Sequence, residues 1–93
     1  MSNEDLKKKL VSEGFKHIYE WQDKPGTKYP PHAHKGKVAM YILEGGLMLT
    51  IDGKTIELKK GDRFDVPVGV EHSAGVGPNG CSYLVGEMIE GDS

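Results

Sequence analysis

The sequence predicts a small all-β protein with one helix at its N-terminus. Its 93 residues include 13 glycines and 5 prolines, a density that indicates many tight turns. After residue 15, apolar and polar residues alternate with a period of two in short segments separated by turn residues. About seven or eight such segments favour a sandwich or a barrel. This length supports one modest core, so we expect a single domain over residues 1–93.

The expected helix spans residues 2–14. Ser2 and Asp5 have the spacing of a capping box, in which each side chain accepts a hydrogen bond from the other residue's backbone N–H. Leu6 and Leu10 form a narrow apolar stripe, and Gly14 suits the left-handed conformation that commonly ends a helix. Because the stripe is thin, we expect the helix to pack against the rest of the domain.

The expected barrel spans residues 15–89, and a polar tail follows at 90–93. Its predicted strands are 15–22, an extended stretch at 29–31, then 38–43, 47–51, 55–58, 63–66, 72–76 and 81–89. Asp52 and Gly53 form a type I′ hairpin signal between two of them. Glycine-rich segments at 44–46, 60–62 and 77–80 are predicted turns.

Composition argues against several partners and compartments. The net charge of −2 and the pI near 6.0 give no electrostatic basis for binding nucleic acid or an anionic membrane. No segment approaches the roughly 20 apolar residues of a membrane span, and residues 1–5 do not resemble a signal peptide. A single cysteine, Cys81, precludes an internal disulfide, so we expect a cytoplasmic protein.

Three of the four histidines form the candidate site. His32 and His34 are two residues apart, so on an extended segment their side chains point to the same face. His72, delivered by a later strand, would complete a set of three imidazoles. Neutral imidazoles suit zinc, copper, nickel and iron(II). The alternative is a set of histidines that only hydrogen-bond inside the barrel.

Alternation predicts where the histidine pair points. If residues 32–42 form one continuous strand, His32 and His34 share a face with Val38 and Met40. The apolar members of this set belong in a core, so the histidines would face the interior.

Eight residues also stand at the spacings of two known motifs. They are Gly26, His32, His34 and Gly45 in the first motif, and Gly61, Pro67, Gly69 and His72 in the second. Over residues 26–76 the chain therefore resembles the small single-domain proteins of the cupin superfamily. The resemblance implies an antiparallel jelly-roll-like barrel in which His32, His34 and His72 hold a metal ion.

Two residues depart from the family pattern. Val38 stands where the family has a glutamate ligand, and Val76 replaces the final asparagine of the second motif. The implied ligand set is therefore three neutral histidines, which leave the charge of a divalent ion uncompensated. Such an ion is a stronger Lewis acid and favours anionic ligands at its open positions.

The resemblance and the ligand set favour a small-molecule oxidoreductase of the dioxygenase type, with iron or copper as the metal. One alternative is a non-oxidative isomerase or hydrolase that uses zinc, nickel or manganese. It lacks an evident general base, because no Asp or Glu in the motifs clearly points inward. Another alternative is a binding or sensor domain without turnover. The sequence identifies neither the substrate nor a catalytic residue.

The remaining candidate residues have structural interpretations. Arg63, the only arginine, is expected to pair with Asp62 or Asp65 on the surface, the alternative being an anchor for a substrate carboxylate. Cys81 is expected to be a buried strand thiol, and His17 a surface residue of a strand. Candidates for a hydroxyl near the metal are Tyr19, Tyr29, Tyr41 and Tyr83, and the predicted core residues include Met40, Met48 and Phe64.

An apolar outer face predicts burial against another surface. Tyr41 and Leu43 point to the side opposite Met40. Either a second subunit or the N-terminal segment would cover them, and we expect a homodimer.

Overall fold

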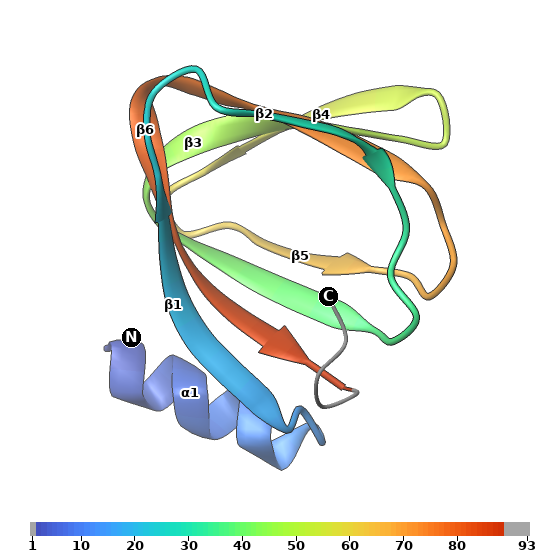
Figure 1. Ribbon diagram of the computed structural model, residues 1–93. Coiled ribbons are helices and arrows are strands. Elements are labelled where there is room, and N and C mark those ends of the chain that lie inside the picture. Colours follow the sequence, from blue (N-terminus) through green and yellow to red (C-terminus); the bar gives the residue numbers. More distant parts are fainter. Residues whose placement is uncertain (1, 89–93) are drawn as a thin grey trace.

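The computed structural model describes residues 2–88 and contains one helix and six strands (Figure 1). They are α1 (Asn3–Ser12), β1 (His17–Asp23), β2 (Lys28–His32), β3 (Val38–Ile51), β4 (Lys54–Lys59), β5 (Arg63–Val66) and β6 (His72–Glu87). The predicted all-β fold with a short N-terminal helix is confirmed. The predicted end of the last strand at residue 89 and the tail at 90–93 lie outside the described residues. No helix among residues 2–88 is long and apolar enough to cross a membrane.

Two long strands, β3 and β6, organise the sheet. They pair with each other antiparallel, and each remaining strand pairs with one of them. β1 and β5 flank one half of this central pair, whereas β2 and β4 flank the other half. The two halves face each other, so the sheet folds into a jelly-roll-like barrel (Figure 1).

The predicted turns at 44–46 and 77–80 are wrong, because both segments continue as strand. The β3–β6 register shifts next to Gly45, where both strands bend. Gly45 and Gly80 have φ of 72° and 75°, and a Cβ on Gly45 would collide with the carbonyl oxygen of Gly80. Glycine therefore permits a bulge and a close approach here without reversing the chain. Merging these segments leaves six strands instead of seven or eight.

Other local signals are confirmed. Asp52 and Gly53 have φ of 55° and 74°, as a type I′ turn requires. Ser2 and Asp5 form the predicted capping box. Gly14 has φ of 97° just after the helix, and this left-handed conformation ends it as expected.

The apolar residues pack on both sides of the half that contains β1. One core lies inside the barrel and comprises Ile42, Leu47, Leu49, Ile51, Leu58, Val76, Cys81 and Tyr83. The other core lies between α1 and the outer face of this half and comprises Leu6, Leu10, Phe15, Ala39, Tyr41 and Leu84. The helix therefore covers the apolar face around Tyr41, which was one of the two alternatives. The homodimer stays a prediction.

Met48 was predicted to be a core residue and is not. Its side chain is 46% exposed, because it alternates with the buried Leu47 and Leu49 and points outward from β3. Met40 and Phe64 are partly buried and pack against the inner core as predicted.

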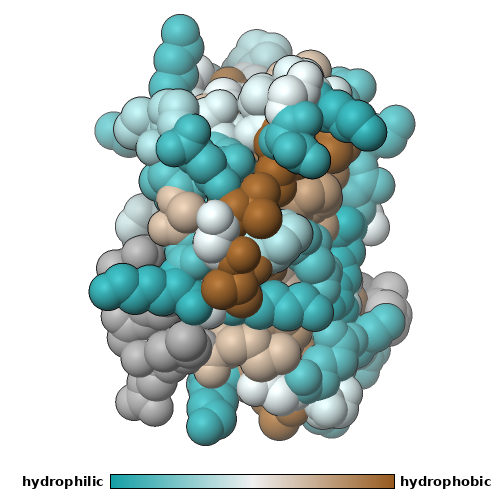
Figure 2. Space-filling view, turned by 90° about the vertical axis from the view of Figure 1, so that its right-hand side faces the viewer, coloured by the Kyte–Doolittle hydropathy of each residue, from teal (hydrophilic) through white to brown (hydrophobic). Residues whose placement is uncertain are grey.

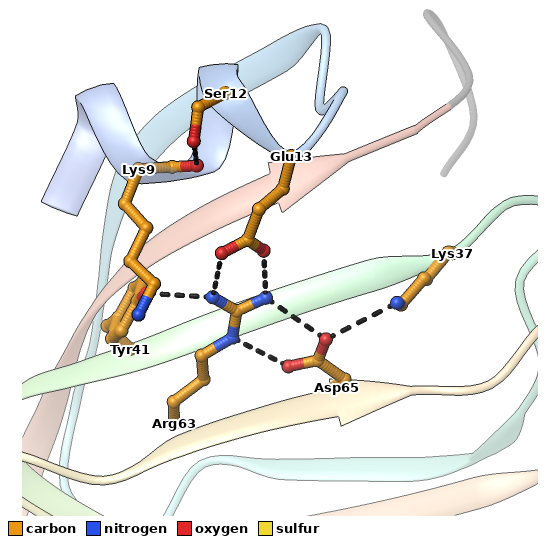
Figure 3. A network of polar contacts seen from close by, with 7 residues as sticks. All are labelled: Lys9, Ser12, Glu13, Lys37, Tyr41, Arg63 and Asp65. Atoms are coloured by element: carbon orange, nitrogen blue, oxygen red, sulfur yellow. Dashed lines mark hydrogen bonds and ion pairs between the residues drawn. The ribbon is translucent and has the colours of Figure 1, made fainter.

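Arg63 joins the end of the helix to the sheet (Figure 3). Its guanidinium donates hydrogen bonds to Glu13 at 2.5 and 3.0 Å, to Asp65 at 2.7 and 3.0 Å, and to the Tyr41 hydroxyl at 2.8 Å. Lys37 forms a further ion pair with Asp65 at 3.5 Å. The predicted pairing with Asp65 is confirmed, whereas the contact with Glu13, fifty residues away, was not anticipated.

Replacing Arg63 with methionine is expected to lower the melting temperature at neutral pH by roughly 2–5 °C, because partly exposed ion pairs each contribute little. Hydrogen bonds from Arg63 hold the pKa of Glu13 and of Asp65 below their usual values of 4.5 and 3.8. A lowered pKa stabilises the fold above the usual value, and the stabilisation is lost as the pH falls through the folded value.

The difference in melting temperature between the parent protein and Arg63→Met should therefore be largest above about pH 5 and should shrink toward about pH 3. Thermal unfolding followed by circular dichroism across this range measures it. A difference that grows on acidification would contradict the assignment.

Candidate metal centre

A cavity of about 580 Å³ lies inside the barrel, on the side of β1 and β2. Its apolar wall comprises Val38, Met40, Leu47, Leu49, Ala74 and Val85. The three predicted histidines line it where β2 ends and β6 begins. Figure 2 shows one outer face of the molecule, on which mostly hydrophilic side chains surround a narrow apolar strip.

His32, His34 and His72 lie close together. One potential ligand atom from each can be chosen so that all lie within 4.8 Å of one another. The ring centroids are 4.3 Å apart for His32 and His72, 5.0 Å for His32 and His34, and 5.1 Å for His34 and His72. His32 and His72 are direct partners in the β2–β6 pairing. The structure therefore brings together the histidines that the sequence singled out.

Residues 32–42 do not form the one continuous strand on which the alternation argument was conditional. β2 ends at His32, a bend follows at 35–36, and β3 begins at Val38. His34, Val38 and Met40 nevertheless line the same cavity as His32. The inward direction predicted for His32 and His34 is therefore found, although a bend at 35–36 interrupts the strand between them and Val38.

Backbone carbonyl groups orient two of the imidazole rings. Nδ1 of His32 lies 2.8 Å from the carbonyl oxygen of Pro30, and Nδ1 of His72 lies 3.1 Å from that of Val70. A carbonyl can only accept, so in each neutral ring Nδ1 carries the proton and Nε2 keeps the lone pair that a metal needs. Histidines that bind a metal through one ring nitrogen usually donate the N–H of the other to a carbonyl or carboxylate group in this way.

A backbone hydrogen bond also ties the two histidine-bearing segments together. The Gly69 N–H donates to the carbonyl oxygen of His34 at 3.0 Å. Gly69 has φ of 73° in the turn that leads to His72, so the turn can lie against the segment around His34.

The donor set fits a divalent transition metal. Three imidazoles with two fixed tautomers can hold one face of an ion, and the cavity leaves room for a small ligand on the other. Among residues 2–88, no carboxylate or thiol joins this group of ligand atoms. Val38 is 5% exposed and lines the same cavity as the histidines.

Sequence reasoning missed a buried carboxylate in the cavity, Asp23. It is 9% exposed and accepts hydrogen bonds from the Tyr29 hydroxyl at 2.7 Å, the Tyr83 hydroxyl at 2.8 Å and Trp21 Nε1 at 2.9 Å. The Tyr29 ring also lies near the three-histidine group, with its centroid 6.4 Å from that of His32. The predicted strand over 15–22 ends one residue before Asp23, although alternation with Trp21 places Asp23 on the inner face of a strand extended by one residue.

Glu87 is a second missed carboxylate. It is 6% exposed, lines the cavity, and accepts a hydrogen bond from the Tyr19 hydroxyl at 3.0 Å. Its β1 partner is His17, which is exposed and lies at the cavity but outside the three-histidine group. Both carboxylates lie outside the motif region 26–76, so motif spacing gave no signal for them.

The phenols around the cavity are hydrogen-bond donors at neutral pH. Burial and then the bond to Glu87 raise the pKa of Tyr19 to about 12. Burial, followed by the bond to Asp23, also raises the pKa of Tyr29 and that of Tyr83. Cys81 is buried as predicted, and burial raises the pKa of its thiol.

Comparisons with known proteins agree with this architecture. A family model described as "Cupin domain" matches residues 19–84. The dimethylsulfoniopropionate lyase DddW of Ruegeria pomeroyi is 34% identical over 62 residues, which cover 67% of this chain and 41% of that protein. The chain thus spans about two fifths of the length of this relative.

Solved structures share the fold. An RmlC-like cupin from Shewanella frigidimarina superposes with a TM-score of 0.72 at 25% identity, covering 84% of this chain and 70% of that chain. The dimethylsulfoniopropionate lyase DddQ of Ruegeria pomeroyi gives a TM-score of 0.71 at 24% identity, covering 78% and 38% respectively.

Proposed function

Since the chain belongs to the cupin domain family, we propose that it binds a divalent transition metal through His32, His34 and His72 and acts there on a small molecule. The observation that carries the proposal is the convergence of three imidazoles, two of them oriented by backbone carbonyls, on an apolar cavity. Iron, zinc, nickel and copper are candidates because they suit imidazole ligands, and manganese, which prefers oxygen ligands, is a candidate for the non-oxidative activity.

The preferred activity is that of a dioxygenase-like oxidoreductase. When bound, iron or copper would supply Lewis acidity and redox chemistry. The chain itself would hold the ion on neutral ligands, which leaves its positive charge for an anionic substrate group. The apolar wall formed by residues such as Met40 and Leu49 would exclude water from a bound substrate.

A non-oxidative lyase is the second candidate, and Asp23 is the observation that favours it. An elimination needs a group that accepts a proton, and Asp23 supplies a buried carboxylate in the cavity wall. The similarity to a protein named as a dimethylsulfoniopropionate lyase points the same way.

We expect one equivalent of transition metal per chain in protein isolated without a histidine tag, because an ion held by three imidazoles should survive purification. Elemental analysis, or anomalous scattering from crystals, measures both the amount and the identity of the metal. Protein that neither contains nor takes up stoichiometric metal would contradict the proposal.

Two assays separate the candidate activities. Oxygen consumption with thiols, diketones and phenols in the presence of iron(II) is expected for the oxidoreductase. Anaerobic conversion of dimethylsulfoniopropionate would instead support the lyase. A metal-loaded protein that is inactive in both assays but binds small molecules would favour a binding or sensor domain.

A further inference from the structure

The cavity wall contains two carboxyl groups that no basic side chain pairs with. Asp23 and Glu87 line it and are 9% and 6% exposed. No lysine or arginine lines the cavity, and neither carboxylate forms an ion pair within residues 2–88. Neither belongs to the three-histidine group. Because these carboxylates have no basic side-chain partner, their part of the wall would suit the cationic end of a ligand whose other end reaches an ion at the histidines.

The hydrogen bonds of Asp23 restrict the kind of cation. A carboxylate has about four lone-pair positions. Oδ1 accepts from Trp21 Nε1 at 2.9 Å and from the Tyr29 hydroxyl at 2.7 Å, while Oδ2 accepts from the same hydroxyl at 2.7 Å and from Tyr83 at 2.8 Å. These are three donors, because the single hydrogen of Tyr29 is shared between the two oxygens, so an ammonium group with three N–H donors would find about one acceptor position of Asp23 free. A fully alkylated cation needs no acceptor.

Aromatic rings complete the environment. Tyr19, Trp21, Tyr29 and Tyr83 line the same cavity. The π faces of such rings attract cations, and quaternary ammonium groups are bound in this way when a nearby carboxylate adds its charge. Burial and the bond to Asp23 raise the pKa of Tyr83, so the phenol keeps its proton and donates a hydrogen bond to the carboxylate.

We propose that the cavity selects small molecules that carry a permanently cationic, fully alkylated group, a quaternary ammonium or a sulfonium, beside Asp23 and the ring of Trp21. The volume of about 580 Å³ suits a small ligand that also reaches the three histidines. This inference rests on the proposed function, because it names the class of small molecule that the cavity would take.

Trp21 provides the readout, because it is the only tryptophan of the chain and its indole donates to Asp23. The isolated, metal-containing protein is titrated with choline and with its neutral isostere, in which a tert-butyl group replaces the trimethylammonium group. We expect choline to change the tryptophan fluorescence and to bind about tenfold more tightly than the isostere. Ethanolamine, whose ammonium has three N–H donors, is expected to bind more weakly than choline. Equal binding of choline and the isostere, or tighter binding of ethanolamine, would overturn the proposal.

Two variants locate the effect. Asp23→Asn should remove most of the preference for choline over the isostere, whereas Glu57→Gln, which neutralises an exposed carboxylate of β4 outside the cavity, should preserve it. An unchanged preference in a folded Asp23→Asn protein would overturn the assignment to Asp23. If that variant does not fold, the ligand comparison in the parent protein still decides.

The metal content of the same samples separates the two hypotheses. A protein that holds one metal per chain but does not prefer choline overturns this inference alone. A protein that takes up no metal overturns the proposed function.

Discussion

Replacement of His72 with alanine is expected to lower the affinity for a divalent transition metal at least about 100-fold. Loss of a group that only hydrogen-bonds to a metal ligand already lowers metal affinity about 10–100-fold. His72 is 5% exposed and pairs directly with His32. Its bond to the carbonyl oxygen of Val70 leaves Nε2 as the ligand atom. Without the His72 imidazole, only His32 and His34 of the three-histidine group remain, and two imidazoles cannot hold one face of the ion.

His17→Ala is the matched control for this variant. It removes the same side chain from the lining of the same cavity, but His17 is exposed and lies outside the three-histidine group. Its metal affinity should equal that of the parent protein. Titration calorimetry and elemental analysis of tag-free protein compare the three, and chemical denaturation verifies that each is folded. Equal affinities in His72→Ala and His17→Ala would contradict the ligand assignment.

The fold class followed from local signals, but the number of strands did not. Turn glycines and strand-bend glycines look the same in a sequence, because both adopt positive φ. Asp52 and Gly53 reverse the chain, whereas Gly45 and Gly80 let two paired strands bend together. Only the pairing of β3 with β6 distinguishes these outcomes, and that pairing joins residues distant in the sequence.

The site was predictable to the extent that it is local. His32 and His34 are neighbours on one segment, and His72 stands at a motif spacing that the family resemblance supplied. The hydrogen bonds of Asp23 depend on Tyr29 from β2 and Tyr83 from β6, which only the folded barrel brings together. These long-range contacts bury an inward-facing carboxylate that no position of the two motifs provides.

Replacing Val38 with glutamate is expected to change both the stability of the protein and the rise in its melting temperature when metal is added. The family resemblance assigns a glutamate ligand to this position. Val38 is 5% exposed, lines the cavity with His32 and His34, and pairs with Glu87 across β3 and β6. Without metal, Val38→Glu would bury a second carboxylate beside Glu87, and the like charges should lower the free energy of unfolding by roughly 2–4 kcal/mol.

Metal should reverse this loss if the introduced carboxylate reaches the ion. A tighter-binding ligand stabilises the folded state more at the same concentration, so added metal should raise the melting temperature of Val38→Glu more than that of the parent protein. Val38→Gln is the control, because it has nearly the same size and adds no charge. It should lose stability without a larger metal response. If added metal raises the melting temperatures of Val38→Glu and Val38→Gln equally, residue 38 does not face the metal. Position 38 would then not correspond to the glutamate ligand of the family motif.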